Sequence, residues 1–506
     1  MDHVFLGEYL TFEQFMTIVK DHKQVKFSEI YSDRVNKSRH QIEQWVDENR
    51  VMYGITTGFG SLCEVVISKD ETAKLQKNLI LSHATSVGSP LSIEEVRAVM
   101  LMVLQNIGQG YSGVRLEVLE RYRDMLNHNI IPYVPSEGSV GYLAIEAHIA
   151  LTLFGDGKVF YNGQLLNVSE VYSLLGWDPI VLAAKEGLAL ISGTTSVTGL
   201  GSVALYNLFQ AAKTADIIAS ITSEALICNL SAFDEKVMKV RPHKDQQDVA
   251  HNLRAILNDS PWLVGNHPRM LQDALSIRCI PQLHGAVRKI LNDAKATIEV
   301  EINSCCDNPI IYMDDDGADV ISACNADSSY VGMAMDSVAI AATNMAKMSE
   351  RRNNRLIDES YSGYPSFLIQ HPGVNSGLMI PQYTQAALLN DMRMLSTSST
   401  IDNTPTCNNQ EDYVGMGYNA SKKSLKIAEN LEYILAIELL SGYLAQKFME
   451  GAERNQVTRL VVNILSKHLP HMDSDVFLSP CIETIKSLIH SGEILTSVEQ
   501  VIGELR

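Results

Sequence analysis

The sequence lacks the features that mark disulfide-stapled, zinc-binding and membrane-spanning proteins. Its eight cysteines form no Cys-x-x-Cys pair and no cluster with histidine, so neither a zinc site nor a disulfide framework is expected. No uncharged apolar run reaches the roughly 20 residues that a bilayer-spanning helix needs. Residues 1–8 show no basic region followed by an apolar one, so no signal peptide is expected. These absences predict a chain without metal or membrane, in a reducing cytoplasm.

Positive charge is also scarce. The chain has 41 lysines and arginines against 59 aspartates and glutamates, and its formal net charge is −18. Because no basic cluster offsets this charge, nucleic acid and anionic membranes are not expected as partners. The hydrophobic share of 46% in 506 residues is typical of a soluble protein with a large core.

Apolar residues recur at helical spacing along most of the chain. Residues 182–230 are rich in Ala, Leu and Ile, which predicts one long buried helix or two in tandem. Two apolar stripes in 425–439 predict a helix with neighbours on both sides. One hairpin is expected around Asp314–Gly317, because Asp-Gly favours a tight turn. Further helices are expected over 37–49, 70–81, 92–105 and 333–352. The fold class is therefore mostly α, built around long central helices.

Two glycine-containing stretches stand out as candidate functional loops. Residues 138–148 read Gly-Ser-Val-Gly-Tyr-Leu-Ala-Ile-Glu-Ala-His, and the two glycines allow close approach or positive φ before a buried helix begins near Leu143. Residues 53–61 carry three glycines and two threonines, which is typical of an irregular loop. A loop of this composition between helices more often carries function than packing.

These stretches belong to a longer series of motifs in a fixed order. The others are Asn-Leu-Ile-Leu-Ser-His at 78–83, Lys-Glu-Gly-Leu-Ala-Leu at 185–190, Ser-Ile-Arg-Cys at 276–279, Asp-Asn-Pro at 307–309, Gly-Val-Asn-Ser-Gly at 373–377 and Asn-Gln-Glu-Asp at 409–412. From about residue 50 to about residue 450 the chain closely resembles the histidine and phenylalanine ammonia-lyase family.

The resemblance implies an architecture and an assembly. It implies a long central helical bundle of the histidine ammonia-lyase type with a smaller N-terminal domain. We expect residues 1–110 to form the N-terminal domain with the catalytic-loop tyrosine, 111–450 the bundle core, and 451–506 a C-terminal helical segment. The resemblance also implies a homotetramer whose active sites each draw residues from three subunits.

The resemblance further implies roles for individual residues. The family reaction is an anti elimination across the Cα–Cβ bond of an amino acid, and Tyr53 matches its base. A tyrosine with a pKa near 10 needs positive charge or donated hydrogen bonds to act as a base at neutral pH. Arg278 matches the arginine that binds the substrate carboxylate. His83 matches a histidine near the substrate ring, although a partly buried histidine with satisfied hydrogen bonds is an equal alternative.

Three further positions complete the retained set. Glu411 matches an acid of the active site that could accept a hydrogen bond from an imidazole N–H. Asn375 and Gln410 are expected to support the geometry of the site.

The departures from the family pattern cluster around one group. The family sequence continues from Gly-Ser-Val-Gly into Ala-Ser-Gly-Asp-Leu-Ala-Pro-Leu-Ala-His, and its Ala-Ser-Gly cyclises into a methylidene-imidazolone electrophile. Here Gly141 is followed directly by Tyr142, and no Ala-Ser-Gly or Thr-Ser-Gly occurs in the chain. Four other family positions are changed as well: the supporting asparagine is Ser192, the second tyrosine is Leu275, the aromatic near the electrophile is Ala326, and the histidine after Glu-Asp is Tyr413. No cofactor is therefore expected.

These changes suggest a substrate whose nitrogen leaves without help from an electrophile. A trimethylammonium group has no lone pair to attack an electrophile, and it leaves as a neutral amine. The chain therefore resembles the branch of the family that eliminates trimethylamine from ergothioneine, the 2-thiol-histidine betaine, to give thiourocanate. Aromatic faces and carboxylates would hold the cation, with Tyr142, Tyr413, Glu146 and Glu411 as candidates. Glu146 could equally face solvent or a neighbouring helix. Arg393 is a candidate contact for the sulfur.

Two other readings stay open. The chain could be a histidine or aromatic amino acid ammonia-lyase whose modified triad is missing from the written sequence. Alternatively, it could be a non-catalytic relative that serves as a binding or assembly protein. Retention of Tyr53 and Arg278 argues against the second of these.

Overall fold

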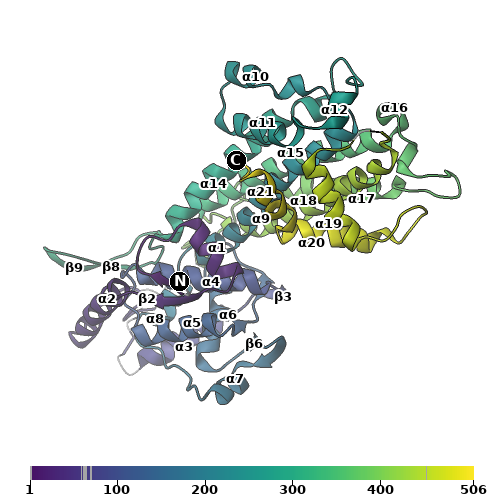
Figure 1. The fold of residues 1–506 in the computed structure, drawn as a ribbon. Coiled ribbons are helices and arrows are strands. Elements are labelled where there is room, and N and C mark those ends of the chain that lie inside the picture. The colour runs from purple at the N-terminus through teal and green to yellow at the C-terminus, as the bar shows by residue number, and fades with distance from the viewer. Residues whose placement is uncertain (1–2, 59, 61–64, 66, 69–70, 452) are drawn as a thin grey trace. The chain divides into compact units, whose positions relative to one another are not determined.

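The computed structural model describes residues 3–58, 60, 65, 67–68, 71–451 and 453–506 (Figure 1). Most of them are helical, as predicted. The chain divides into two compact units, each assembled from three segments. The first comprises Met1–Ala204, Ala294–Asp336 and Ser398–Lys422, and the second comprises Leu205–Asp293, Ser337–Thr397 and Lys423–Arg506. The sequence-based division at residues 110 and 450 stays a prediction.

The first unit contains a group of helices, among them the first part of α9, which is one of four long helices that it shares with the second unit. They are α1 (Phe12–Lys20), α2 (Glu29–Asp47), α3 (Thr72–His83), α4 (Ile93–Gly108), α5 (Leu116–Asn127), α6 (Ala144–Leu151), α7 (Val168–Leu175), α8 (Glu186–Ile191) and the first part of α9 (Thr195–Ala225). Helix α4 lies in the core, with every residue from Val96 to Gly108 buried. It starts with a capping box between Ser92 and Glu95, which satisfies the first backbone N–H groups.

The strands of the first unit form small sheets at its periphery. β1 (His3–Leu6) pairs in parallel with β2 (Gln24–Phe27), and β3 (Val87–Pro90) pairs antiparallel with β5 (Pro135–Glu137). A three-stranded sheet has the order β4 (Ile131–Pro132), β6 (Lys158–Tyr161), β7 (Gln164–Asn167). β8 (Ile310–Asp314) and β9 (Gly317–Ile321) form the predicted hairpin, with Asp314 opposite Gly317 at the turn.

The second unit is built from helices. Its helices are α10 (Glu235–Val240), α11 (Lys244–Leu257), α12 (Pro261–Gly265), α13 (Leu275–Arg278), α16 (Glu359–Ser362), α17 (Met379–Leu395), α19 (Gln456–His468), α20 (Leu478–His490) and α21 (Glu493–Ile502). Four long helices contribute residues to both units, namely α9, α14 (Ile280–Ile302), α15 (Ser329–Ile357) and α18 (Gly417–Ala445). Single 3₁₀ turns are η3 (Thr152–Phe154), η4 (Leu230–Phe233), η5 (Ser366–Leu368), η6 (Cys407–Asn409) and η7 (Gln446–Phe448).

The long apolar helices are core helices. On α18, both predicted apolar stripes are buried from Ile427 onward, with Leu431, Leu435, Ile427 and Ile434 all at most 1% exposed. The tandem alternative for residues 182–230 is confirmed, because the chain leaves helix geometry between α8 and α9. There Ser192 is extended, and Gly193 has a φ of +109°.

One described stretch, Glu186–Ala225, is long and apolar enough to cross a membrane, but its apolar window is wholly buried. We therefore interpret it as interior packing rather than as a membrane span.

Candidate active site

The loop at residues 138–143 is fixed from two sides within the first unit. The N–H of Leu143 donates to the carbonyl of Ile191 over 3.1 Å. A Cβ on Gly141, whose φ is +145°, would lie 3.0 Å from Oγ of Ser328, so the backbone passes this serine closely. Leu143 has an unfavourable φ of +77° immediately before α6. Such strain persists only where the surrounding structure enforces it, which is common at functional sites.

Tyr142 follows this glycine and contacts a second candidate residue. Its hydroxyl donates a long hydrogen bond of 3.5 Å to Oε2 of Glu411. Burial raises the pKa of the Tyr142 phenol above its ordinary value, and the negative charge of Glu411 raises it further. The phenol therefore stays protonated and acts as a hydrogen-bond donor. The structure thus brings together two residues that lie 269 positions apart in the sequence.

The residues around Tyr142 do not fit the methylidene-imidazolone group of the resembled family. That group is made from three residues, and the chain has a tyrosine where the triad and its aspartate would stand. The Tyr142 phenol points to Glu411, and the Gly141 backbone packs on Ser328. No chemical step is therefore derived through that group.

The Tyr53 side chain sits within its own loop. Its phenol oxygen accepts a hydrogen bond from the N–H of Gly60 over 3.0 Å. The threonines stiffen the loop, because Thr56 donates to the carbonyl of Arg50 over 2.8 Å and Thr57 donates to the carbonyl of Met52 over 3.3 Å. This backbone donor holds the phenol oxygen within the loop. This geometry suits the predicted role of Tyr53 as a base.

Residues 403–416 contact Tyr142 and the glycine that binds Tyr53. A Cβ on Gly60 would lie 2.8 Å from Sγ of Cys407, so the thiol lies against the glycine that binds Tyr53. Four residues later, Glu411 accepts from Tyr142. The N–H of Thr406 donates to the carbonyl of Glu411 over 2.9 Å, which holds the two contact points together. Gln410 is exposed, and its N–H bonds to the carbonyl of Cys407, in keeping with a supporting role.

Two of the changed family positions lie on either side of a short polar chain. The Tyr413 hydroxyl is 2.9 Å from Oγ of Ser329, which donates in turn to Asp327 over 3.0 Å. Ala326 is half-buried and directly precedes Asp327. Tyr413 is 56% exposed, so it is accessible to a ligand or to another chain.

Ser192 lies at the end of α8, beside the Asp-Asn-Pro segment. It is buried, and its Oγ accepts from the N–H of Asn308 over 3.1 Å. Asp307 forms a fully buried ion pair with Lys185 over 2.7 Å, which holds the 307–309 segment against the start of α8. Ser192 thus supports the backbone of the Asp-Asn-Pro motif.

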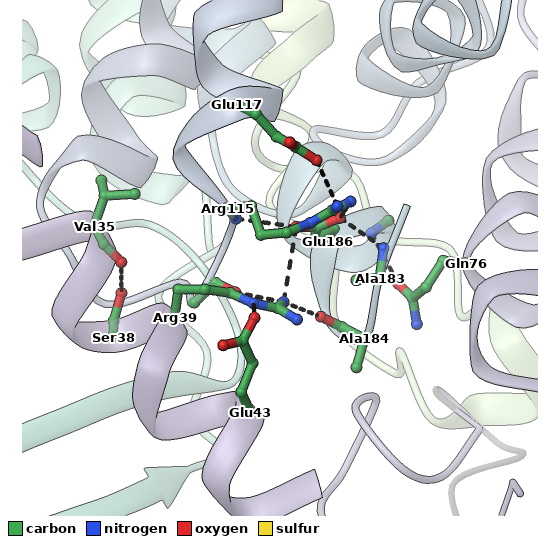
Figure 2. A network of polar contacts seen from close by, with 12 residues as sticks. Val35, Ser38, Arg39, Glu43, Gln76, Arg115, Glu117, Ala183, Ala184 and Glu186 are labelled. Atoms are coloured by element: carbon green, nitrogen blue, oxygen red, sulfur yellow. Dashed lines mark hydrogen bonds and ion pairs between the residues drawn. The ribbon is translucent and has the colours of Figure 1, made fainter. Parts of the chain in front are cut away.

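A polar network fixes the start of α8 (Figure 2). Figure 2 shows Arg115 and Arg39 turned toward the buried carboxylate of Glu186. Arg115 binds it through Nε over 2.7 Å and through Nη2 over 2.8 Å. Nη1 of Arg39 lies 3.7 Å from the same carboxylate and donates to the carbonyl of Ala184 over 3.0 Å. Because α8 leads directly into Ser192, this network sets the position of Ser192.

His83 lies at the end of α3. Its Nδ1 is 2.8 Å from the carbonyl of Leu79 on the same helix, so Nδ1 carries the hydrogen. Burial lowers the pKa of His83, which keeps the imidazole neutral near pH 7. This arrangement fits a histidine with a satisfied hydrogen bond, and it leaves the predicted proximity to a substrate ring a prediction.

In the second unit, Arg278 faces a cavity of about 270 Å³ that Gln272, Asp273 and Asn229 also line. With its amide oxygen toward the guanidinium, Gln272 accepts from Arg278 at 3.1 to 3.3 Å. Among the described residues, no carboxylate forms an ion pair with this arginine. A planar guanidinium with a neutral partner in a cavity is suited to a carboxylate ligand.

Leu275 and Arg393 lie together in the same unit. Both line a mainly apolar cavity of about 720 Å³, together with Lys347 and Arg351. Leu275 is 61% exposed.

The side-chain amide of Asn375 is hydrogen-bonded to two backbone groups. Its nitrogen donates to the carbonyl of Gln370 over 3.1 Å, and its oxygen accepts from the N–H of Asp475 over 3.1 Å. The expectation that Asn375 supports geometry agrees with these bonds.

The structure decides among the alternatives for Glu146 and adds residues that the sequence did not single out. Glu146 is fully buried and bonds to the neighbouring helix α9, so it is not placed to hold a substrate cation. Gly60 and Cys407 were not predicted, and no local sequence signal links them. Ser329 was not predicted either, although a Ser-Ser pair before a helix is a common start signal.

The chain is similar over its full length to known lyases. The sequence model of the family described as aromatic amino acid lyase matches residues 10–467. The chain is 40% identical to the histidine ammonia-lyase of Caldanaerobacter subterraneus, over 98% of this chain and 97% of that protein. The crystal structure of histidine ammonia-lyase from Trypanosoma cruzi matches with a TM-score of 0.91 at 33% identity, covering 98% of this chain and 95% of that chain.

A third comparison concerns the predicted substrate. The structure of ergothionase from Treponema denticola matches with the same TM-score of 0.91, but at 26% identity, over 98% of this chain and 100% of that chain. The prediction that this chain eliminates trimethylamine from ergothioneine is wrong, because relatives named histidine ammonia-lyase are considerably more similar in sequence. A protonated amine also leaves as a neutral molecule, ammonia, so the missing electrophile does not by itself require a trimethylammonium group. By its sequence and its fold, the chain belongs to the aromatic amino acid lyase family.

Proposed function

We propose that this chain is a carbon–nitrogen lyase that converts L-histidine into urocanate and ammonia. The observation that carries the proposal is the 40% identity to a histidine ammonia-lyase over almost the whole of both chains. The retained candidate residues support it. The Tyr53 oxygen accepts a hydrogen bond from Gly60, Arg278 lines a cavity, and Glu411 accepts a hydrogen bond from Tyr142.

The proposed reaction needs three events that these residues can serve. The Tyr53 phenolate takes a proton from the β-carbon, the Cα–Cβ double bond forms, and the Cα–N bond breaks. If the substrate amine is protonated, it leaves as ammonia and takes the bonding electrons with it. The hydrogen bond from Gly60 would stabilise the phenolate before the proton transfer. Arg278 would hold the substrate carboxylate with its two parallel N–H groups.

Glu411 is the proposed acceptor for the protonated amine or the imidazole N–H of histidine. Its carboxylate already accepts from the Tyr142 hydroxyl, which limits its rotation. A negative charge beside the amine would favour the ammonium form, whose departure requires no further proton. His83, neutral near pH 7, is proposed to lie along the imidazole ring.

The assembly is part of the proposal. Members of the resembled family form homotetramers with shared active sites, and we propose the same for this chain in the cytoplasm. Exposed aromatic and apolar side chains such as Tyr413, Leu275 and Tyr330 would then be covered by other copies. Sedimentation of the purified chain at several concentrations tests the tetramer.

The decisive experiment compares amino acids as substrates for the purified full chain. L-Histidine, L-phenylalanine and L-tyrosine are incubated separately, and the unsaturated acid and ammonia are both quantified. We expect histidine to be consumed fastest, with one urocanate and one ammonia formed per molecule. Preference for an aromatic amino acid, or no product from any of the three, would overturn the proposal.

The intact mass of the same preparation answers a separate question. A mass equal to that of the 506-residue sequence means that catalysis depends on ordinary side chains. A mass larger by one cyclised Ala-Ser-Gly triad means that the written sequence lacks the modified residues. Both outcomes are compatible with histidine as the substrate.

A further inference from the structure

Glu146 is a carboxyl group without contact to solvent, one turn after the loop that carries Tyr142. It is 0% exposed and lies on α6. Its Oε1 accepts two hydrogen bonds from the first residues of α9, one from Oγ1 of Thr195 and one from the N–H of Ser196, both over 2.8 Å. The first N–H groups of a helix have no partner within the helix, so Glu146 satisfies one of them from outside.

These two bonds differ from an ordinary helix cap, in which the capping side chain belongs to the residue just before the helix. The side chain that caps α9 belongs to another helix, and the capped helix follows Ser192, Gly193 and Thr194. The backbone bond from Leu143 to Ile191 ties the same two segments together just before α6 and α9 begin. The chain around residues 143–146 is therefore held to residues 191–196 at two points.

Burial raises the pKa of the Glu146 carboxyl and so favours its neutral form. Oε1 accepts both hydrogen bonds, whereas the buried Oε2 has no partner among the described residues. A protonated carboxyl offers this arrangement, with its carbonyl oxygen as acceptor and its proton on the other oxygen. Glutamine has the same shape and the same acceptor, so it can replace Glu146 at this position. Leucine has a similar size but no acceptor.

We infer that Glu146 is a positioning residue of the candidate active site: it fixes the 138–143 loop, and with it Tyr142, against the start of α9. Glu146 does not touch a substrate, because it is enclosed by protein. It acts through the loop, since a shift of α6 moves Tyr142 away from Glu411 across a contact that is already 3.5 Å long. The consequence for turnover rests on the proposed function, whereas the consequence for the loop does not.

The test uses two substitutions at Glu146 and a matched control. Glu146→Leu removes the acceptor, and Glu146→Gln keeps it. The control is Glu224, another fully buried carboxyl in the second unit, which accepts from Asn455 N–H over 2.8 Å, from Thr458 Oγ1 over 2.6 Å and from Oγ of Ser260. Glu224→Leu leaves a comparable set of buried donors unsatisfied outside the candidate site. A milder variant, Thr195→Val, removes one of the two bonds from the other side and serves if Glu146→Leu does not fold.

The first readout is hydrogen–deuterium exchange of the full chain, which requires no activity. We expect Glu146→Leu to speed exchange about tenfold in peptides covering 139–147 and 191–197. The free energy of local opening should fall there by about the contribution of one hydrogen bond. Glu146→Gln should exchange within about threefold of the wild type. Glu224→Leu should speed exchange around 455–458 and leave 139–147 unchanged. Equal exchange at 139–147 in the wild type and Glu146→Leu would overturn the inference.

The second readout is a double-mutant cycle on histidine turnover. If Glu146 acts through Tyr142, then Tyr142→Phe lowers kcat/KM less in the Glu146→Leu background than in the wild type. Fully additive effects, or an equal loss of kcat/KM in Glu224→Leu, would show that Glu146 only stabilises the fold. If the wild type does not turn over histidine, the proposed function fails, and the exchange experiment alone decides the role of Glu146.

Discussion

The Tyr142 hydroxyl donates to Oε2 of Glu411 over 3.5 Å, from a phenol that burial and this carboxylate keep protonated. The two tyrosines of the candidate site therefore differ in their hydrogen bonds. Tyr142 donates a hydrogen bond, whereas the oxygen of Tyr53 accepts one from Gly60. On this basis we propose Tyr53 as the base and Tyr142 as the residue that orients Glu411.

Replacing Tyr53 tests the assignment of the base. Tyr53→Phe keeps the ring and removes the oxygen that takes the proton. We expect kcat for histidine to fall by about 10² to 10⁴, the usual contribution of a general base, with little change in the melting temperature. Tyr312→Phe, on a half-exposed tyrosine of β8, is the control and should leave kcat unchanged. A fall of less than about threefold in Tyr53→Phe would assign the base elsewhere.

Replacing Tyr142 tests whether its hydroxyl orients Glu411. Tyr142→Phe should lower kcat/KM about 10- to 100-fold, because a hydrogen bond to a charged group contributes roughly 1.5–3 kcal/mol. Tyr433 and Glu483 form the matched pair outside the site, with a hydroxyl–carboxylate distance of 2.9 Å. Tyr433→Phe should leave kcat/KM at the wild-type value. Equal kinetics for Tyr142→Phe and the wild type would remove Tyr142 from the account.

Arg278 should be sensitive to a change that keeps its charge. Arg278→Lys loses the planar fork that can bind a carboxylate through two N–H groups. We expect KM for histidine to rise about tenfold or more, with a smaller change in kcat. Arg254→Lys, at an arginine that bonds to the carbonyl of Phe233, is the control in the same unit. An unchanged KM in Arg278→Lys would mean that the carboxylate binds elsewhere.

The buried carboxyl of Glu146 should make the free energy of unfolding fall as pH rises. Burial raises the pKa of Glu146 in the folded chain, so the folded state holds the proton more tightly than the unfolded state. As pH rises above the ordinary glutamate value of about 4.3, the unfolded chain ionises first and the folded state loses stability. The free energy of unfolding of the wild type, minus that of Glu146→Gln, should therefore decrease from about pH 4 to pH 8. A difference that stays constant or increases would contradict the neutral, buried carboxyl.

The Glu186 network is expected to be a major stabilising element of the first unit. Glu186→Leu leaves the guanidinium of Arg115 without its buried partner, which should cost about 3–5 kcal/mol of unfolding free energy. The comparison is Glu453→Leu at the exposed Arg459–Glu453 pair, where we expect at most about 1 kcal/mol. Denaturant titrations measure both values. Equal losses in the two variants would show that the buried network adds no special stability.

Local patterns sufficed for much of the fold. The hairpin at 310–321 was predictable because its turn depends on four consecutive residues, and α18 because its two apolar stripes repeat over several turns. Ser192 and Gly193 allowed a break in the long apolar run, but only the structure places it. Propensity alone does not decide between a continuous helix and two helices when small residues interrupt an apolar stretch.

The sequence indicated which residues are candidates for the site, but it did not indicate which of them contact one another. Motif order identified Tyr53, Tyr142 and Glu411, but the contact between Cys407 and Gly60 depends on how distant loops pack. Glu146 was ambiguous because a single acid in an apolar helix can be buried or exposed, and only the neighbours decide. The substrate was misassigned because the missing triad shows which chemistry is absent and does not show which amine departs.

The most direct measurement of the central claim follows histidine labelled with ¹⁵N at the α-amino group through complete turnover by the full chain. We expect one labelled ammonia and one urocanate per histidine, and in Tyr53→Phe both signals should form about 10² to 10⁴ times more slowly. Recovery of unchanged labelled histidine from the wild-type protein, under conditions where it is folded and fully assembled, would contradict the account.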